Sequence, residues 1–229
     1  MPHVTAAPAA PIERAPFDVL TADRPTWRGR LHAWTFFLAI PAGVLLIVFA
    51  DRPSTRAAAA VYFGTLLLVF GTSAAYHRLA KTYRQREIMQ RLDHSMIYFL
   101  ITGTYVPICL VALPGTWGIP LLAAVGGLGL LGVVIKLAVI HRLHTLSYAL
   151  YPVMGWAAVA VTPALTSHLS GLQLGLVVGG GVAYTLGFPV LLLRRPDPWP
   201  KVFGYHEIWH AFTVLAAVLH FTAVATVVA

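Results

Sequence analysis

The chain has 229 residues, of which 58% are hydrophobic and only 10% charged, against roughly 25% charged in ordinary soluble domains. This composition excludes a soluble globular protein and indicates one polytopic membrane domain, because the polar interruptions between its apolar runs are too short to hold a second core. The net charge of +8 is spread along these short interruptions. It therefore argues against a nucleic-acid partner, which needs basic residues gathered on one surface.

Residues 1–26 begin the chain with five prolines among alanines. They lack the apolar core of a signal peptide. We therefore predict a flexible cytoplasmic tail that precedes a membrane domain of residues 27–229.

Seven apolar runs of about 20 residues follow, each long enough to cross a hydrocarbon layer about 30 Å thick. They lack the two-residue alternation of outer-membrane strands, and backbone polar groups must be paired in lipid. We therefore predict an all-α fold, a bundle of seven transmembrane helices. The predicted spans are 31–50, 57–80, 88–113, 118–139, 145–165, 171–193 and 203–228.

The orientation follows from the basic residues, which gather on the cytoplasmic side of membrane helices. With seven spans, 14 of the 16 Lys and Arg residues lie on the side of the N-terminus, and only Arg52 and Arg56 lie on the other. We therefore predict a cytoplasmic N-terminus and a C-terminus outside the cell.

Polar residues recur at the predicted cytoplasmic ends of the first three spans. His32 opens the first span and could reach a shared site there. In the second span, Ser73 and His77 are four residues apart, so they share one helix face. Asp93 and His94 lie about two turns into the third span. Ionisable residues at membrane depth are costly and usually have a partner, which makes these residues candidates for a functional site.

The middle of the chain offers weaker candidates. Cys109 is the only cysteine, which excludes an intramolecular disulfide, and we interpret it as a small packing residue. His141 and His144 fall in the predicted loop after the fourth span, and His168 falls in the loop after the fifth. We expect these three histidines to be solvated loop residues.

The last span begins with YHEIWHAF, in which His206, Glu207 and His210 have the H-E-x-x-H spacing of zinc proteases. His220 lies about 21 Å further along the helix than His206, too far to bind the same metal ion. A third ligand is therefore expected from upstream, and His77 is the candidate. Glu207 is rotated by about 100° from His206, so we expect it beside the positive helix terminus and not as a general base.

The topology, which rests on Lys and Arg alone, brings His77, His206, His210, Asp93 and Ser73 to one depth. Three imidazoles with an open position for water are typical of a catalytic zinc site, so Zn²⁺ is the expected cofactor. Asp93 would accept the proton of that water and Ser73 would orient it. Simpler roles stay open, because His77 could be interfacial, Asp93 could begin a helix and Ser73 could bond its own helix.

Successive blocks of the sequence resemble the hemolysin III family, which belongs with the progestin and adipoQ receptors. The blocks are GTSAAYH, RLDHSMIYFLITGTYVP, YPVMGW, GGGVAYTLG and YHEIWHAFTVLAAVLHF, in order between about residue 27 and the C-terminus. The resemblance implies a seven-helix protein whose zinc ligands are His77, His206 and His210, with Asp93 and Ser73 around a bound water. Some relatives carry an acidic residue before the histidine of the first span, whereas WRGRLHAW has none, which weakens a role for that position.

The resemblance also implies a chemistry. The receptor relatives look like zinc-dependent lipid amidases, and the wider group includes alkaline ceramidases. We therefore expect a metal-dependent hydrolase that acts on a membrane lipid amide or ester and is linked to membrane lipid homeostasis. Bacterial relatives are named for haemolysis, so the alternative is a pore-forming or cytolytic protein, or a receptor-like regulator, in which zinc is structural.

Overall fold

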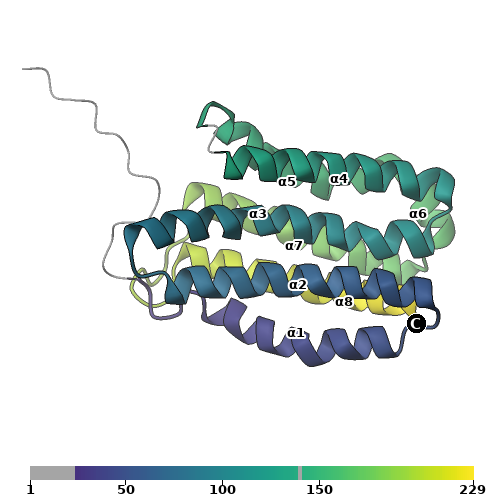
Figure 1. Ribbon diagram of the computed structural model, residues 1–229, viewed down its shortest axis with the longest axis horizontal. Helices are drawn as coiled ribbons and strands as arrows, with labels where there is room; N and C mark the ends of the chain where they lie inside the picture. The colour runs from purple at the N-terminus through teal and green to yellow at the C-terminus, as the bar shows by residue number, and fades with distance from the viewer. Residues whose placement is uncertain (1–23, 139–140) are drawn as a thin grey trace, which may run out of the picture.

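The computed structural model describes residues 24–138 and 141–229. In these residues the long helices lie side by side and run in nearly parallel directions, which confirms the all-α fold (Figure 1). Seven segments of the described chain are long and apolar enough to cross a membrane, as predicted. The helices are α1 (Arg30–Val48), α2 (Pro53–Leu79), α3 (Tyr83–Pro107), α4 (Gly115–Leu137), α5 (His144–Gly155), α6 (Thr162–His168), α7 (Gly171–Leu193) and α8 (Tyr205–Val228).

Two spans are irregular. The fifth span, His144–His168, consists of α5, the 3₁₀ turn Ala157–Val161 and α6. Helix α5 ends at Gly155. Pro163 lies in the first turn of α6, where proline is tolerated because backbone N–H groups at that position have no partner within the helix. Helix α3 continues as the π-helical turn Ile108–Ala112. The sequence prediction located both spans but treated each as one regular helix with narrower limits.

The third span starts five residues before the predicted position 88, at Tyr83. Thr82 caps it, because its hydroxyl accepts the N–H of Gln85 at 3.2 Å while the Gln85 side-chain oxygen accepts the N–H of Thr82 at 3.1 Å. This reciprocal pair is a capping box. It begins the helix in a polar segment that hydropathy alone assigns to a loop.

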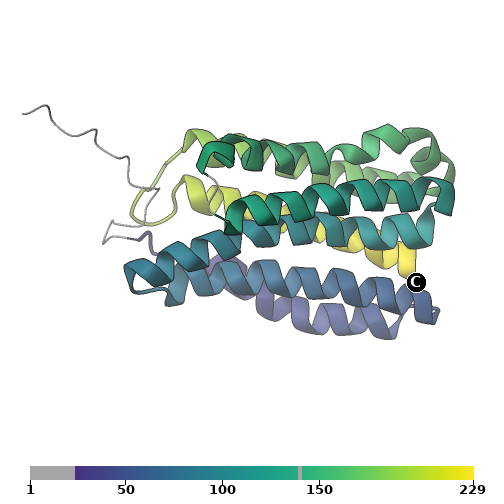
Figure 2. The ribbon, with the colours of Figure 1, turned by 45° about the horizontal axis from the view of Figure 1, so that its top comes forward.

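Helix α8 (yellow) lies between α1 and α2 on one side and α7 on the other (Figure 2). It contacts α1, α2, α3 and α7. Cys109 is 1% exposed within a hydrophobic core built mainly by α3, α4 and α5, in agreement with a packing role. Large apolar side chains such as Phe37 and Leu38 are instead exposed on the outside of the bundle, as expected for a surface that faces lipid.

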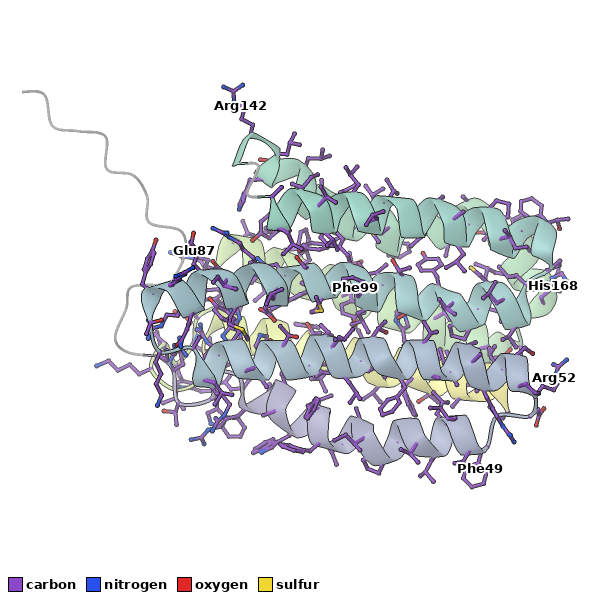
Figure 3. All side chains as sticks on the ribbon, in the orientation of Figure 1. Phe49, Arg52, Glu87, Phe99, Arg142 and His168 are labelled. Atoms are coloured by element: carbon purple, nitrogen blue, oxygen red, sulfur yellow. The ribbon has the colours of Figure 1, made fainter. Side chains whose placement is uncertain are left out.

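The two ends of the bundle carry the residues that the topology assigned to opposite sides. Glu87 and Arg142 lie at one end, and Arg52 and His168 lie at the other (Figure 3). The first end, which we call the site end, is where α2 finishes and α8 begins. The cytoplasmic orientation of the site end stays a prediction. Of the tail predicted for residues 1–26, residues 1–23 lie outside the described residues.

Candidate metal centre

Three histidines meet at the site end of the bundle. His77 lies in the last turn of α2, and His206 and His210 lie one turn apart at the start of α8. One ring nitrogen from each lies within 4.8 Å of the other two, and the Nε2 atoms of His77 and His206 are 3.2 Å apart. Ligand nitrogens on a tetrahedral zinc ion are about 3.4 Å apart. The donor set therefore fits a zinc ion, and the ligand roles of the three residues stay predictions.

Asp93 and Ser73 lie beside these histidines. The Oδ2 atom of Asp93, on α3, is 3.9 Å from Nε2 of His77. Ser73 is buried one turn before His77 on α2, and it lines the same cavity as Asp93. Asp93 is thus close enough to contact a water molecule held among the histidines. The structure brings both residues to the predicted centre, and their catalytic roles stay predictions.

A fourth imidazole, that of His32, belongs to the same cluster. Its ring stacks on the ring of His210, with 3.7 Å between centroids and an angle of 10° between planes. Its Nδ1 atom lies 2.8 Å from the hydroxyl oxygen of Ser73. The sequence indicated only that His32 could reach the site, because nothing in its spacing relates it to residues on other helices.

Glu207 forms hydrogen bonds at the start of α8. Its side chain is 1% exposed, and its Oε1 atom accepts a hydrogen bond from Nε of Arg28 at 2.6 Å. Its Oε2 atom accepts the backbone N–H of Gly204 at 2.9 Å, which caps the start of α8. Both carboxylate oxygens are therefore bonded at the helix terminus, as expected for a carboxylate beside the positive end of the helix, and its lack of a general-base role stays a prediction.

The chain before α1 braces His77. Gly29 has a φ of 74° at the start of α1, and a Cβ atom added there would lie 2.6 Å from Cβ of His77. Arg24 donates hydrogen bonds to the backbone carbonyls of His77 and Ala80, where α2 ends. Cations at this position are favoured because the carbonyl end of a helix is negative. Burial, and then the neighbouring Arg86, lower the pKa of Arg24.

Two cavities border the histidine cluster. A cavity of about 250 Å³ extends from His32, Asp93 and His210 to His220, between α3, α5, α7 and α8. Its walls are largely apolar, with aromatic and aliphatic side chains from these four helices. A second cavity of about 450 Å³ opens at the site end, next to His77 and His206. The cluster therefore lies between an apolar interior and the end of the bundle.

His94 was grouped with Asp93 by sequence and takes a separate position. It lines both cavities, and its Nδ1 atom is 3.4 Å from the Tyr148 hydroxyl. The hydroxyl of Tyr151 donates to the His94 carbonyl at 2.8 Å. These bonds link α3 to α5 across the wall of the inner cavity. The sequence signal for this role was only that a histidine follows Asp93.

The remaining histidines lie away from the cluster. Nε2 of His220 donates to the carbonyl of Val177 on α7 at 3.1 Å, so this residue both lines the cavity and joins two helices. His144 and His168 are exposed, as expected, but they do not lie in loops. His144 begins α5 and His168 ends α6, because the fifth span extends beyond its predicted limits of 145 and 165. His141 likewise lies in a 3₁₀ turn.

The fold and the histidine cluster define a class: a multi-pass membrane protein of seven helices with a candidate metal centre near one end of the bundle. Residues 20–221 match the model of the family described as Haemolysin-III related. The chain belongs to this family, and it is a multi-pass protein of the cell membrane.

Two Bacillus proteins are similar to the chain. The "Hemolysin-3 homolog" of Bacillus subtilis (strain 168) is 34% identical over 186 residues, which is 80% of this chain and 84% of that protein. "Hemolysin-3" of Bacillus cereus is 31% identical over 196 residues, which is 84% of this chain and 86% of that protein. Both alignments cover most of the membrane domain.

Proposed function

We propose that the protein is a zinc-dependent hydrolase that acts on an amide or ester bond of a membrane lipid. The observation that supports this most is the meeting of three imidazoles with a carboxylate at the end of an apolar cavity. His77, His206 and His210 would hold the ion. Zinc in such a site supplies a Lewis acid for the substrate carbonyl and a water that ionises near neutral pH.

Asp93 and Ser73 supply the groups that handle protons and orientation. Hydrolysis adds water across a C–N or C–O bond, so one proton must leave the attacking water and one must reach the leaving amine or alcohol. Asp93 is the carboxylate next to His77, and it can accept the first proton and donate the second. Ser73 lines the same cavity as Asp93, and its hydroxyl would orient the attacking water.

The cavity favours a lipid as the substrate. Its 250 Å³ would hold part of an acyl chain against the apolar side chains of α3, α5 and α7. At its lipid-facing edge, Nε1 of Trp156 donates to the hydroxyl of Thr185 at 2.9 Å, and both side chains are exposed on the outside of the bundle. A chain could therefore enter from the membrane while its carbonyl lies beside the histidines.

The ion is tested first. Purified protein should contain about one zinc per chain. His206→Ala and His210→Ala should lose it, whereas His168→Ala, at the other end of the bundle, should keep it. Equal zinc content in all four proteins would exclude the assignment of the ligands.

The reaction is tested separately. In liposomes that contain a lipid amide, the wild type should release fatty acid, and Asp93→Asn should keep zinc but lose at least 100-fold in rate. No release from any lipid amide or ester by zinc-loaded protein would exclude the hydrolase.

The names of the two Bacillus relatives suggest membrane lysis as a second function. The same liposomes, loaded with a dye, distinguish the two functions. Dye leakage that is equal in wild type and Asp93→Asn, without fatty-acid release, would support lysis with a structural zinc ion.

A further inference from the structure

We propose that Tyr105 and His220 close the far end of the inner cavity and thereby set the length of the acyl chain that the protein accepts. The inner cavity is the one of about 250 Å³ that begins beside His32, Asp93 and His210. The hydrolysis of such a chain rests on the proposed function, whereas a length limit on a bound hydrocarbon chain does not.

The far end of the cavity follows from the directions of the helices. Helices α3, α5 and α8 begin at the site end, and α7 finishes there (Figure 1). The lining residues farthest from the site end are Tyr105 on α3, Gly181 on α7 and His220 on α8, with Trp156 directly after α5. These residues therefore form the end of the cavity that is most distant from the histidine cluster.

Tyr105 is fixed at this end by hydrogen bonds across the break in the fifth span. Its hydroxyl donates to the carbonyl of Met154, in the last turn of α5, at 2.9 Å and accepts the N–H of Ala158, in the following 3₁₀ turn, at 3.0 Å. A rotation of the Tyr105 side chain would break both bonds, and unpaired backbone groups inside a bundle are costly. Tyr105 is therefore a rigid part of the cavity wall.

His220 is fixed in the same way between α8 and α7. Its Nε2 atom lies 3.1 Å from the carbonyl oxygen of Val177, and because a carbonyl only accepts, Nε2 is the donor. The ring lies against the α7 backbone, since a Cβ atom added at Gly180 would be 2.3 Å from Nε2. The ring of Tyr184 packs beside it at 5.8 Å between centroids. His220 thus fills the space between the two helices.

The cavity ends at these residues because closely packed cores begin behind them. Cys109 lies one turn past Tyr105 on α3, and Val224 lies one turn past His220 on α8. Both are buried in hydrophobic clusters. Interiors of this kind have few voids and resist the insertion of further methylene groups.

The distance between the two ends gives the length of chain that fits. Twelve residues of α3 separate Asp93 from Tyr105, which is roughly 18 Å, and ten residues of α8 separate His210 from His220, which is roughly 15 Å. An extended hydrocarbon chain advances roughly 1.3 Å per carbon. We therefore expect the cavity to accept chains of up to roughly 12–14 carbons.

Two substitutions should move this limit in opposite directions. His220→Ala removes the ring, so the limit should rise by roughly three carbons. Gly181 shares its face of α7 with Tyr184 and Phe188, which also line the cavity, and a Cβ atom there meets no atom within 4 Å. Gly181→Leu should therefore fill the far end and lower the limit by roughly three carbons.

The matched control is Gly175→Leu on the same helix. Gly175 is exposed, does not line the cavity, and a Cβ atom there also meets no atom within 4 Å. Its chain-length profile should equal that of the wild type.

The test is the binding of saturated fatty acids of about 8 to 20 carbons, a range that brackets the expected limit. Each fatty acid competes with a fluorescent fatty acid for zinc-loaded protein in detergent. Chains below the limit should bind with similar affinity, because methylene groups gain little on moving from hydrocarbon to an apolar cavity. Chains that exceed it should bind at least roughly tenfold more weakly. N-acyl amides of the same lengths should show the same limit in kcat/KM.

The outcomes are distinguishable. Fatty-acid binding without an upper length limit in the wild type, as expected if the chain leaves the bundle between Trp156 and Thr185, would overturn the proposal. So would an unchanged limit in Gly181→Leu, or a loss of affinity in that variant that is equal at all lengths. Gly181→Leu adds a side chain to open space, so this test stands even if His220→Ala does not fold. If the zinc-loaded wild type hydrolyses no lipid, the proposed function fails, and fatty-acid binding still decides the length limit.

Discussion

The contact between Gly29 and His77 makes the substitution Gly29→Ala a sensitive test of the candidate metal centre. Gly29 begins α1 with a φ of 74°, in the left-handed region that disfavours side chains. Its added Cβ atom would meet Cβ of His77 at 2.6 Å, whereas ordinary contacts of this kind lie between 3.4 and 4 Å. The atom it meets adjoins the α2 backbone, so it cannot move away as a flexible side-chain end could.

The expected effects have two parts. The left-handed conformation with a Cβ costs roughly 1–2 kcal/mol, and the added atom in a tight contact costs roughly 1–3 kcal/mol. Relief of the contact requires α1 and α2 to separate by about 1 Å, whereas zinc–ligand distances tolerate only about 0.2 Å. We therefore expect stability to fall by about 2–5 kcal/mol and zinc affinity to fall at least roughly tenfold.

The assay is competition for zinc with a chromophoric chelator, together with thermal unfolding in the same detergent. Gly64→Ala is the matched control on α2, because a Cβ there meets no atom within 4 Å. It should keep zinc affinity and gain up to roughly 1 kcal/mol of stability from the higher helix propensity of Ala. Zinc affinity and unfolding temperature equal to wild type in Gly29→Ala would refute the reasoning.

Three further predictions concern the start of α8, the packing of α4 and the acid sensitivity of the centre. Glu207→Gln removes the carboxylate charge that pairs with Arg28, so thermal unfolding should show a loss of roughly 1–3 kcal/mol, while zinc content stays at wild-type level; a loss of zinc without destabilisation would contradict the helix-capping role. Gly118→Ala would put a Cβ 2.0 Å from the backbone oxygen of Cys109, so it should destabilise the protein, whereas Gly127→Ala on the same helix meets no atom within 4 Å and should not; equal unfolding temperatures for the two variants would disprove this packing. Zinc should dissociate in acid, because protons compete with the metal for imidazole nitrogens; zinc content that stays constant down to roughly pH 3, measured by elemental analysis after dialysis, would contradict a centre made of histidines.

The seven spans could be predicted because their length is a local property of the chain. A hydrocarbon layer about 30 Å thick requires about 20 apolar residues, whatever the neighbouring helices are. The limits were less accurate where other effects decide them. The capping box of Thr82 and Gln85 begins α3 in a polar segment. Gly155 and Pro163 lie where the fifth span is divided, and the sequence alone did not show that a 3₁₀ turn would join its two parts.

The sequence by itself determined which residues share a depth. The i, i+4 pairs on α2 and α8 follow from helix geometry, and the distribution of Lys and Arg indicated that His77, Asp93 and His206 would lie near the same end. Only the tertiary structure decided which of the groups at that depth touch. His32 stacks on His210, 178 positions later in the chain, because α1 packs beside α8. Arg28, just before α1, pairs with Glu207 of H-E-x-x-H at the start of α8. Depth is set by each helix and the membrane separately, whereas lateral contact depends on how side chains from distant helices fit together.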